Sequence, residues 1–303
     1  MQFKQLAQFW QKIEGRASRL EMTAILADLF KEAGAEEINK IVYLSLGCLQ
    51  PKFAGVEFNL AEKMVLRSIN RAFNCQSEAI YKKTGDLGKV ISNFQLPISN
   101  KISNLTVKEV YQRLWEIAVD SGQGSQERKV NNLARLMQDL DSLSAQFIVR
   151  IPVNNLRLGF SDMTVLDGLS WMVRGDKSLR PELEKAFNVC ADIGFISQEF
   201  KNYGIQRIQK IKPQAGVPVR PQKSERLASA EAIVEKLKTF AVEGKWDGLR
   251  VQIHLDRASA KASAGEAKLF EDKQAALVRI FSRNLDILRR CFRTSARQWK
   301  NWQ

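Results

Sequence analysis

The chain has 303 residues, of which 47 are lysine or arginine and 33 are aspartate or glutamate, giving a formal net charge of +14. Its length suggests about two domains, and its basic balance favours an anionic partner, with nucleic acid ahead of a membrane surface. A single histidine and four cysteines without Cys-x-x-Cys spacing disfavour histidine-ligated zinc sites and disulfide frameworks. The longest apolar stretch, 41–49, is too short to span a membrane and the N-terminus is amphipathic, so the sequence predicts a cytoplasmic protein without a membrane partner.

The first two hundred residues predict an all-α domain. Ser18 is a suitable N-cap for the first clear apolar stripe, which covers 22–30. Stripes of the same spacing predict further helices over 60–73, 107–119, 130–143 and 163–173. No fixed-period repeat is present, so a regular solenoid is not indicated.

A glycine-containing loop, 121–127, precedes one of these helices. Gly122 and Gly124 stand just before it, and Arg128 and Lys129 lie in its first turns. Glycines at this position allow backbone N–H groups at a helix N-terminus to approach a phosphate, where the helix dipole also favours an anion. Taken alone, the short pattern fits a flexible interhelical loop better.

A second loop, 154–160, precedes the helix that is expected to start near Ser161. It pairs Arg157 with a turn at Gly159, which again suits a backbone phosphate and is again a weak signal alone. Neither loop carries features that read base edges, so the binding they suggest does not depend on sequence.

Composition changes after residue 200. Residues 201–303 carry 22 basic and 10 acidic side chains, against 25 and 23 in residues 1–200. Three of the seven prolines, Pro213, Pro218 and Pro221, fall within 211–223, which cannot be helical and is interpreted as an extended linker. We therefore place a domain boundary at 206–225.

The second region changes to strand periodicity. A helix over 230–237 is expected after Ser229, followed by strands over 240–242 and 251–255. Between the two strands lies the segment 243–250, EGKWDGLR, on an expected strand-to-strand turn.

This segment has the chemistry of a nucleophilic site. A lysine held at a strand end beside other cations has a lowered pKa, so Lys245 can attack the α-phosphate of a nucleotide and form a phosphoramidate. Gly248 permits close approach of the ligand, and Arg250 can hold ribose or phosphate oxygens. The alternative is a solvated hairpin tip with ordinary charges, and the combined spacing favours the functional interpretation.

Five segments together resemble the N-terminal part of an ATP-dependent DNA ligase of the archaeal and eukaryotic type. The segment 243–250 resembles the motif that carries the adenylated lysine, and 278–284, VRIFSRN, resembles the next motif. Upstream, GDLG at 85–88, GQGSQ at 122–126 and LRLG at 156–159 resemble the helical DNA-binding domain of these enzymes.

The resemblance implies a multidomain fold. Its parts would be an all-α helical DNA-binding domain at 1–205, the linker at 206–225, and at 226–286 the beginning of an α/β (α+β) nucleotidyltransferase domain. Lys245 would accept AMP from ATP with Mg²⁺, for which no ligands are assigned, while Glu243 would contact adenine. Arg250 and Arg283 would contact the nucleotide or the nick. The residues expected to grip the duplex are Gly122, Gly124, Ser125, Arg157 and Gly159.

The same resemblance implies a monomer that seals nicks in duplex DNA during replication, repair and recombination. The chain departs from the family pattern because later nucleotidyltransferase motifs and the OB-fold are absent. Residues 257–272 are expected to form an inserted loop or short helix. The tail 287–303 is hypothesised to be a frameshifted reading, because back-translation two bases out of frame is compatible with the family's continuation.

Two alternatives remain open at this point. The polypeptide could be a non-catalytic module that binds nicked or continuous duplex, since the later motifs are missing. It could also be a helical protein-interaction scaffold with a chance lysine motif, in which case binding to nicked DNA would be absent or insensitive to salt.

Overall fold

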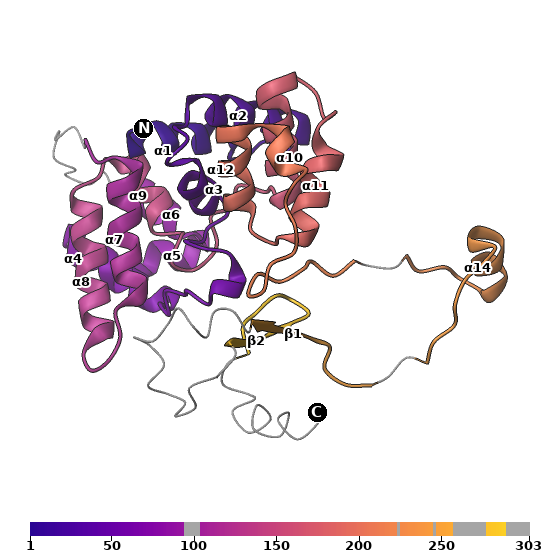
Figure 1. Ribbon diagram of the computed structural model, residues 1–303. Coiled ribbons are helices and arrows are strands. Elements are labelled where there is room, and N and C mark those ends of the chain that lie inside the picture. Colours follow the sequence, from indigo (N-terminus) through magenta and orange to yellow (C-terminus); the bar gives the residue numbers. More distant parts are fainter. Residues whose placement is uncertain (94–103, 223–224, 245–246, 257–276, 289–303) are drawn as a thin grey trace. The chain divides into compact units, whose positions relative to one another are not determined.

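A computed structural model describes residues 1–93, 104–222, 225–244, 247–256 and 277–288 (Figure 1). Contacts divide the chain into two compact units, Met1–Lys212 and Pro213–Gln303, which we call unit 1 and unit 2. The described part is mostly helical and contains a single sheet of two strands. None of its helices is long and apolar enough to cross a membrane.

All elements named in the described part of unit 1 are helices, apart from an isolated antiparallel bridge between Gln2 and Thr106 (Figure 1). Its elements are α1 (Phe3–Ile13), α2 (Arg19–Glu32), α3 (Ile38–Ser45), the 3₁₀ turn η1 (Lys52–Ala54), α4 (Glu62–Phe73), α5 (Glu78–Thr84), α6 (Leu87–Asn93), α7 (Val107–Val119), α8 (Ser125–Gln138), α9 (Ser142–Ile148), α10 (Asp162–Arg174), α11 (Arg180–Val189), α12 (Ile193–Tyr203) and α13 (Ile205–Ile208).

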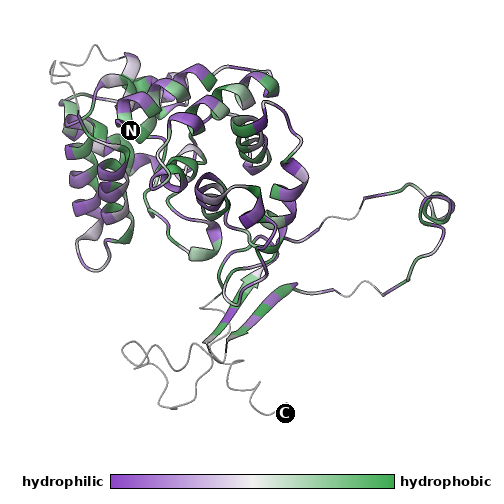
Figure 2. Cartoon of the chain, turned by 45° about the horizontal axis from the view of Figure 1, so that its top comes forward, coloured by the Kyte–Doolittle hydropathy of each residue, from purple (hydrophilic) through white to green (hydrophobic). Residues whose placement is uncertain are grey.

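The core of unit 1 forms where these helices bury their apolar faces (Figure 2). Helix α2 packs on α10, α3 on α12, α4 on α8 and α6 on α9, and α1 contacts both α2 and α9. Trp10 is fully buried, with the rings of Phe3 and Phe147 edge-on at 5.7 and 5.3 Å. Its indole N–H donates to Ser45 Oγ at 2.8 Å, so this large side chain joins α1, α3 and α9 without an unsatisfied polar group.

Most of the predicted helices of this unit are confirmed, including the Ser18 cap, whose side chain accepts from the Glu21 amide. The helix predicted over 130–143 is wrong at its C-terminal end, because α8 stops at Gln138. The Asp141 side chain accepts from the Ser144 amide and starts a separate helix, α9, which breaks the apolar stripe in two.

Unit 2 contains α14 (Ala230–Leu237) and an antiparallel pair, β1 (Val251–Asp256) and β2 (Leu277–Ser282). The Ser229 cap and the strand expected over 251–255 are confirmed. The strand predicted over 240–242 is wrong, since Val242 is 85% exposed coil. Among the described residues β1 pairs only with β2, so a strand at 240–242 has no ladder to join. The insertion predicted at 257–272 lies outside the described residues.

The proline-rich segment is non-helical from Ile211 to Gln222, as predicted. It packs on the sheet through side chains of β1. The Gly216 amide donates to His254 Nδ1 at 3.0 Å, and the Gln252 side chain exchanges two hydrogen bonds with the backbone of Val219. Burial lowers the pKa of His254, which favours the neutral ring that can accept from Gly216. The domain boundary at 206–225 stays a prediction, and α13 occupies its first residues.

Candidate nucleic-acid interface

The segment 85–88 connects α5 to α6, and three of its residues each have a distinct structural role. Gly85 ends α5 in a left-handed conformation with φ +59°, and its amide donates to Tyr81 O at 2.8 Å. The Asp86 carboxylate then accepts from the Gly88 amide at 2.9 Å and so caps the start of α6. A Cβ atom on Gly88 would lie 2.3 Å from Arg150 Nε, so this position has no room for a side chain.

Asp86 and Arg150 form a buried, two-bonded ion pair. Arg150 follows α9, and its Nε and Nη2 donate to the two carboxylate oxygens at 2.9 and 2.8 Å. Both side chains are almost fully buried, at 3% and 4% exposure. Burial alone would raise the pKa of the Asp86 carboxyl, but the hydrogen bonds and charge of Arg150 outweigh it and hold the pKa below its usual value. Glu14, at the end of α1, approaches Arg150 Nη1 at 2.8 Å.

Arg157 stands beside this pair on the loop that leads into α10. Its backbone is left-handed, with φ +61°, which is uncommon for a residue other than glycine. The neighbours Leu156 and Leu158 are buried, so the loop is fixed on both sides of an exposed arginine. Gly159, also left-handed at φ +72°, completes the turn before Ser161.

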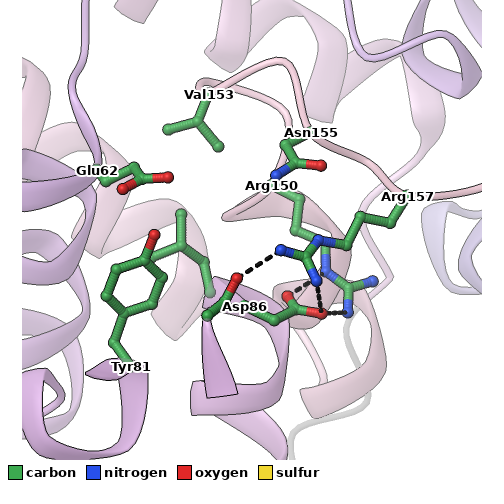
Figure 3. Close-up of a pocket in the computed structure, with 9 residues that line it drawn as sticks. Glu62, Tyr81, Asp86, Arg150, Val153, Asn155 and Arg157 are labelled. Carbon is green, nitrogen blue, oxygen red and sulfur yellow. Dashed lines mark hydrogen bonds and ion pairs between the residues drawn. The ribbon is translucent and has the colours of Figure 1, made fainter. Parts of the chain in front are cut away.

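The Arg157 guanidinium faces the segment 85–88 (Figure 3). Its Nη2 donates to the Gly85 carbonyl oxygen, and its Nη1 lies 3.6 Å from Asp86 Oδ2. Glu62 and Tyr81 face it across a small pocket with room for about one water molecule. The side chain remains 41% exposed, so the site cannot enclose a base but can present a guanidinium to a phosphate.

The other predicted loop is held by its own helix. Gly122 and Gly124 are left-handed, at φ +86° and +74°, and Gly124 immediately precedes α8. The Arg128 guanidinium turns back to Asp120 at 2.6 and 3.0 Å and to the carbonyl oxygens of Ser121 and Gln123. Its donors therefore order the loop and are not directed at an incoming ligand.

Lys129, the second cation of that helix start, is buried. Its ammonium donates to Phe58 O at 2.7 Å and Ala118 O at 3.2 Å, and burial lowers its pKa. The groups that the 121–127 loop leaves exposed are backbone amides. Among the described residues, the amides of Gly122, Gln123 and Gly124 have no protein acceptor. A phosphate at this loop would be bound by N–H groups at the start of α8.

The two loops lie at the same end of a pair of parallel helices. Glu127, near the start of α8, accepts from Arg67 in the middle of α4 at 2.8 Å, and Gln138, the last residue of α8, donates to the carbonyl oxygen of Ala72 near the end of α4 at 2.9 Å. Because α4 and α8 run in the same direction, their first residues, Glu62 and Ser125, start at the same end of unit 1. Glu62 lines the pocket of Arg157, so the two loops both lie toward the end of unit 1 at which α4 and α8 start.

In unit 2 the lysine motif is only partly described. Lys245 lies outside the described residues, and the flanking 243–244 and 247–250 are exposed coil. The predicted strand-to-strand turn is therefore wrong on its N-terminal side, where no strand is present. Arg250 directly precedes Val251, which pairs with Ser282, and Arg283 follows Ser282, so both arginines lie at one end of the sheet. Ser282 Oγ accepts from the Asn284 and Asp286 amides and closes the tight turn that carries Arg283. No interaction joins Glu243 to either arginine among the described residues.

Exposed backbone amides at one loop and an exposed arginine at the other are features of a protein surface that contacts nucleic-acid backbone. A family model described as DNA ligase N terminus matches residues 2–170. The chain is 42% identical over 289 residues to a probable DNA ligase of Dictyoglomus turgidum, covering 94% of this chain and 46% of the relative. It is 39% identical over 269 residues to a DNA ligase of Sulfurisphaera tokodaii, covering 84% and 45%.

The chain therefore belongs to the DNA ligase family, which confirms the resemblance to the N-terminal portion of ATP-dependent DNA ligases. A third relative, DNA ligase 2 of Thermofilum pendens, is 41% identical over 266 residues, covering 82% of this chain and 44% of the relative. The chain spans about half the length of the curated relatives it matches.

Asp86 and Arg150, which lie beside Arg157 in the candidate interface, are not among the residues that the sequence predicts for the site. Asp86 lies in the segment 85–88, whose sequence signal is its family resemblance, and Arg150 belongs to no motif. A charged residue directly after the apolar run 147–149 is the one clue that could have marked Arg150 as a buried partner of a distant carboxylate.

Proposed function

We propose that this chain takes part in ATP-dependent sealing of nicks in duplex DNA, and that unit 1 contributes by binding the duplex through its phosphates. The observation that carries the proposal is the position of two helix-start loops at one end of α4 and α8, one presenting backbone amides and the other Arg157. Both features bind phosphate irrespective of base sequence. The family membership supports a nicked duplex as the ligand.

The chemical steps are proposed from the family resemblance. The Lys245 amine attacks the α-phosphate of ATP and pyrophosphate leaves. AMP then passes to the 5′-phosphate at the nick, and the 3′-hydroxyl displaces AMP to form the new phosphodiester. Arg250 and Arg283, at one end of the two-stranded sheet, are suited to hold phosphate oxygens, and we assign Glu243 to the adenine. Mg²⁺ would offset the phosphate charge, and the described residues contain no cluster of three metal-ligating side chains to assign to it.

The 303-residue chain is expected to bind nicked DNA without becoming adenylated. The described residues 243–244 and 247–250 are exposed coil, so they do not form the enclosed pocket that a purine needs. Incubation with ATP labelled at the α-phosphate is therefore expected to leave the chain unlabelled, while a mobility-shift assay shows binding to nicked duplex. Strong labelling that disappears in Lys245→Ala would contradict this expectation and show that these residues adenylate unaided.

Arg157→Ala is expected to weaken binding to a nicked duplex about tenfold at low salt, because a charge-assisted hydrogen bond to a phosphate is lost. The slope of log K against log salt should decrease in magnitude by about one. Fluorescence anisotropy across a salt series measures both quantities. The control is Arg113→Ala, which removes the same charge from an exposed pair with Asp139 at the other end of α8. Equal effects of the two variants would show that only net charge matters.

Gly122→Ala tests the backbone loop against a matched glycine. Gly122 and Gly175 are both left-handed, at φ +86° and +74°, and a Cβ atom would meet nothing within 4 Å at either. Alanine at either position should cost about 1 kcal/mol of stability because of backbone strain. Gly175 ends α10, at the far end of the helix that follows the Arg157 loop. Only Gly122→Ala is expected to reduce DNA affinity in the same anisotropy assay. A similar reduction in Gly175→Ala would argue against a phosphate at the loop.

A further inference from the structure

We infer that the buried Asp86–Arg150 ion pair positions Arg157 for phosphate contact, so that Asp86 and Arg150 are positioning residues for DNA binding. This inference rests on the proposed function, because it needs Arg157 to contact DNA. Its starting point is that Arg157 has a strained, left-handed backbone at an exposed position, a conformation that persists only where the surroundings hold it.

The Arg157 side chain is oriented by direct contacts with the segment 85–88. Its guanidinium makes one hydrogen bond, from Nη2 to the carbonyl oxygen of Gly85, and a longer charge contact to Asp86. Among the described residues its remaining N–H groups have no acceptor. The side chain is thus oriented by one neutral carbonyl while most of its donors stay available for a phosphate.

The Gly85 carbonyl group is in turn held in place through its neighbour Asp86. Gly85 and Asp86 are adjacent, so the orientation of the Asp86 side chain and that of the Gly85 carbonyl are set by the same short stretch of backbone. Asp86 is fixed by three hydrogen bonds, two from Arg150 at 2.9 and 2.8 Å and one from the Gly88 amide at 2.9 Å. Gly88 leaves space for the Arg150 guanidinium, which a Cβ atom would displace.

Asp86 has two conceivable and opposite effects on Arg157. A carboxylate near Arg157 could also compete with phosphate for the guanidinium. The distances argue against competition, because both Asp86 oxygens bond Arg150 at normal length while Arg157 Nη1 is 3.6 Å away. Asp86 is held mainly by Arg150, which also contacts Glu14, and the more distant Arg157 adds only a weaker attraction, so most donors of Arg157 stay available for the ligand. Positioning predicts that loss of Asp86 weakens DNA binding, and competition predicts that it strengthens binding.

A double-mutant cycle tests the inference. The 303-residue chain is compared as wild type, Asp86→Asn, Arg157→Ala and the double variant. Affinity is measured by anisotropy with a fluorescein-labelled nicked duplex bearing a 5′-phosphate, and folding is checked by urea unfolding. Asp86→Asn is expected to weaken binding about fivefold when Arg157 is present and less than about twofold when it is alanine. The control is Asp141→Asn, another aspartate that caps a helix start, which should leave affinity unchanged.

The outcomes are distinct. An equal loss in both backgrounds would mean that Asp86 does not act through Arg157 and would overturn the inference, as would tighter binding by Asp86→Asn. Wild-type affinity in Arg157→Ala would instead refute the phosphate contact itself and hence the proposed function at this loop. If Asp86→Asn does not fold, Arg150→Lys takes its place in the cycle, because it keeps a positive charge beside Asp86 and removes the two-bonded geometry. The same coupling to Arg157 is expected, and its absence would overturn the inference.

Discussion

Arg150→Ala is expected to lower the free energy of unfolding of unit 1 by about 3–5 kcal/mol, because it leaves the Asp86 carboxylate buried without its partner. The two side chains are 4% and 3% exposed and share two hydrogen bonds, so the variant removes both charged donors from an almost fully buried carboxylate. Arg150 also contacts Glu14, which extends the effect to the end of α1. Urea unfolding followed by circular dichroism at neutral pH measures the change.

The matched control for this variant is Arg113→Ala. Arg113 forms an ion pair with Asp139 at 2.7 Å, but its side chain is 40% exposed and that of Asp139 is 53% exposed. The loss should therefore be about 0.2–1 kcal/mol. Equal losses in the two variants would contradict the structural role of the buried pair.

The same pair has a defined pH dependence. Because the pKa of Asp86 is lowered in the folded protein, its stabilisation is present above the pKa of the unfolded chain and is lost as the pH falls through the folded pKa. The stability difference between wild type and Asp86→Asn should thus be constant near neutrality and shrink below about pH 4. A difference that grows on acidification would contradict the assignment.

Lys129→Met is expected to destabilise unit 1 by about 2–4 kcal/mol, because methionine fills similar space but leaves two buried carbonyl oxygens without a donor. The ammonium of Lys129 joins the segment before α4, through Phe58, to the end of α7, through Ala118. Lys129 lies in the first turns of α8, and α7 ends just before the Gly122 loop, so DNA affinity should fall together with stability. Urea unfolding and anisotropy measure the two effects.

The control for Lys129→Met is an exposed lysine. Lys31 is 55% exposed and pairs with Asp28 within α2, so Lys31→Met should change stability by less than about 0.5 kcal/mol. A stabilised Lys129→Met variant would show that the cost of burying the ammonium exceeds the value of its two hydrogen bonds.

Local features of the fold follow from the sequence. The apolar stripes predict the helices of unit 1, and Ser18 and Ser229 mark helix starts, because these signals depend on neighbours within a few residues. The strand expected at 240–242 fails for the opposite reason. A strand depends on a partner elsewhere in the chain, and alternation over three residues says nothing about that partner.

The sequence predicts the loops of the candidate site, but it does not predict the side-chain interactions that hold those loops in place. Gly122, Gly124 and Gly159 do adopt the left-handed conformations that a glycine-dependent turn requires. Arg128, however, bonds its own loop, and Lys129 bonds buried carbonyl groups. The direction in which a side chain at a helix start points depends on which carbonyl groups pack against it. The link between Asp86 and Arg150 spans 64 positions, and no local pattern encodes it.

Because Arg157 has a left-handed backbone, selection for stability and selection for DNA binding favour different residues at position 157. Glycine relieves the strain there at no steric cost, so a library screened only for heat resistance should become enriched in glycine at position 157. The same library screened for retention on DNA should keep arginine. Opposite outcomes from one position would identify it as a place where binding, and not folding, has determined the residue.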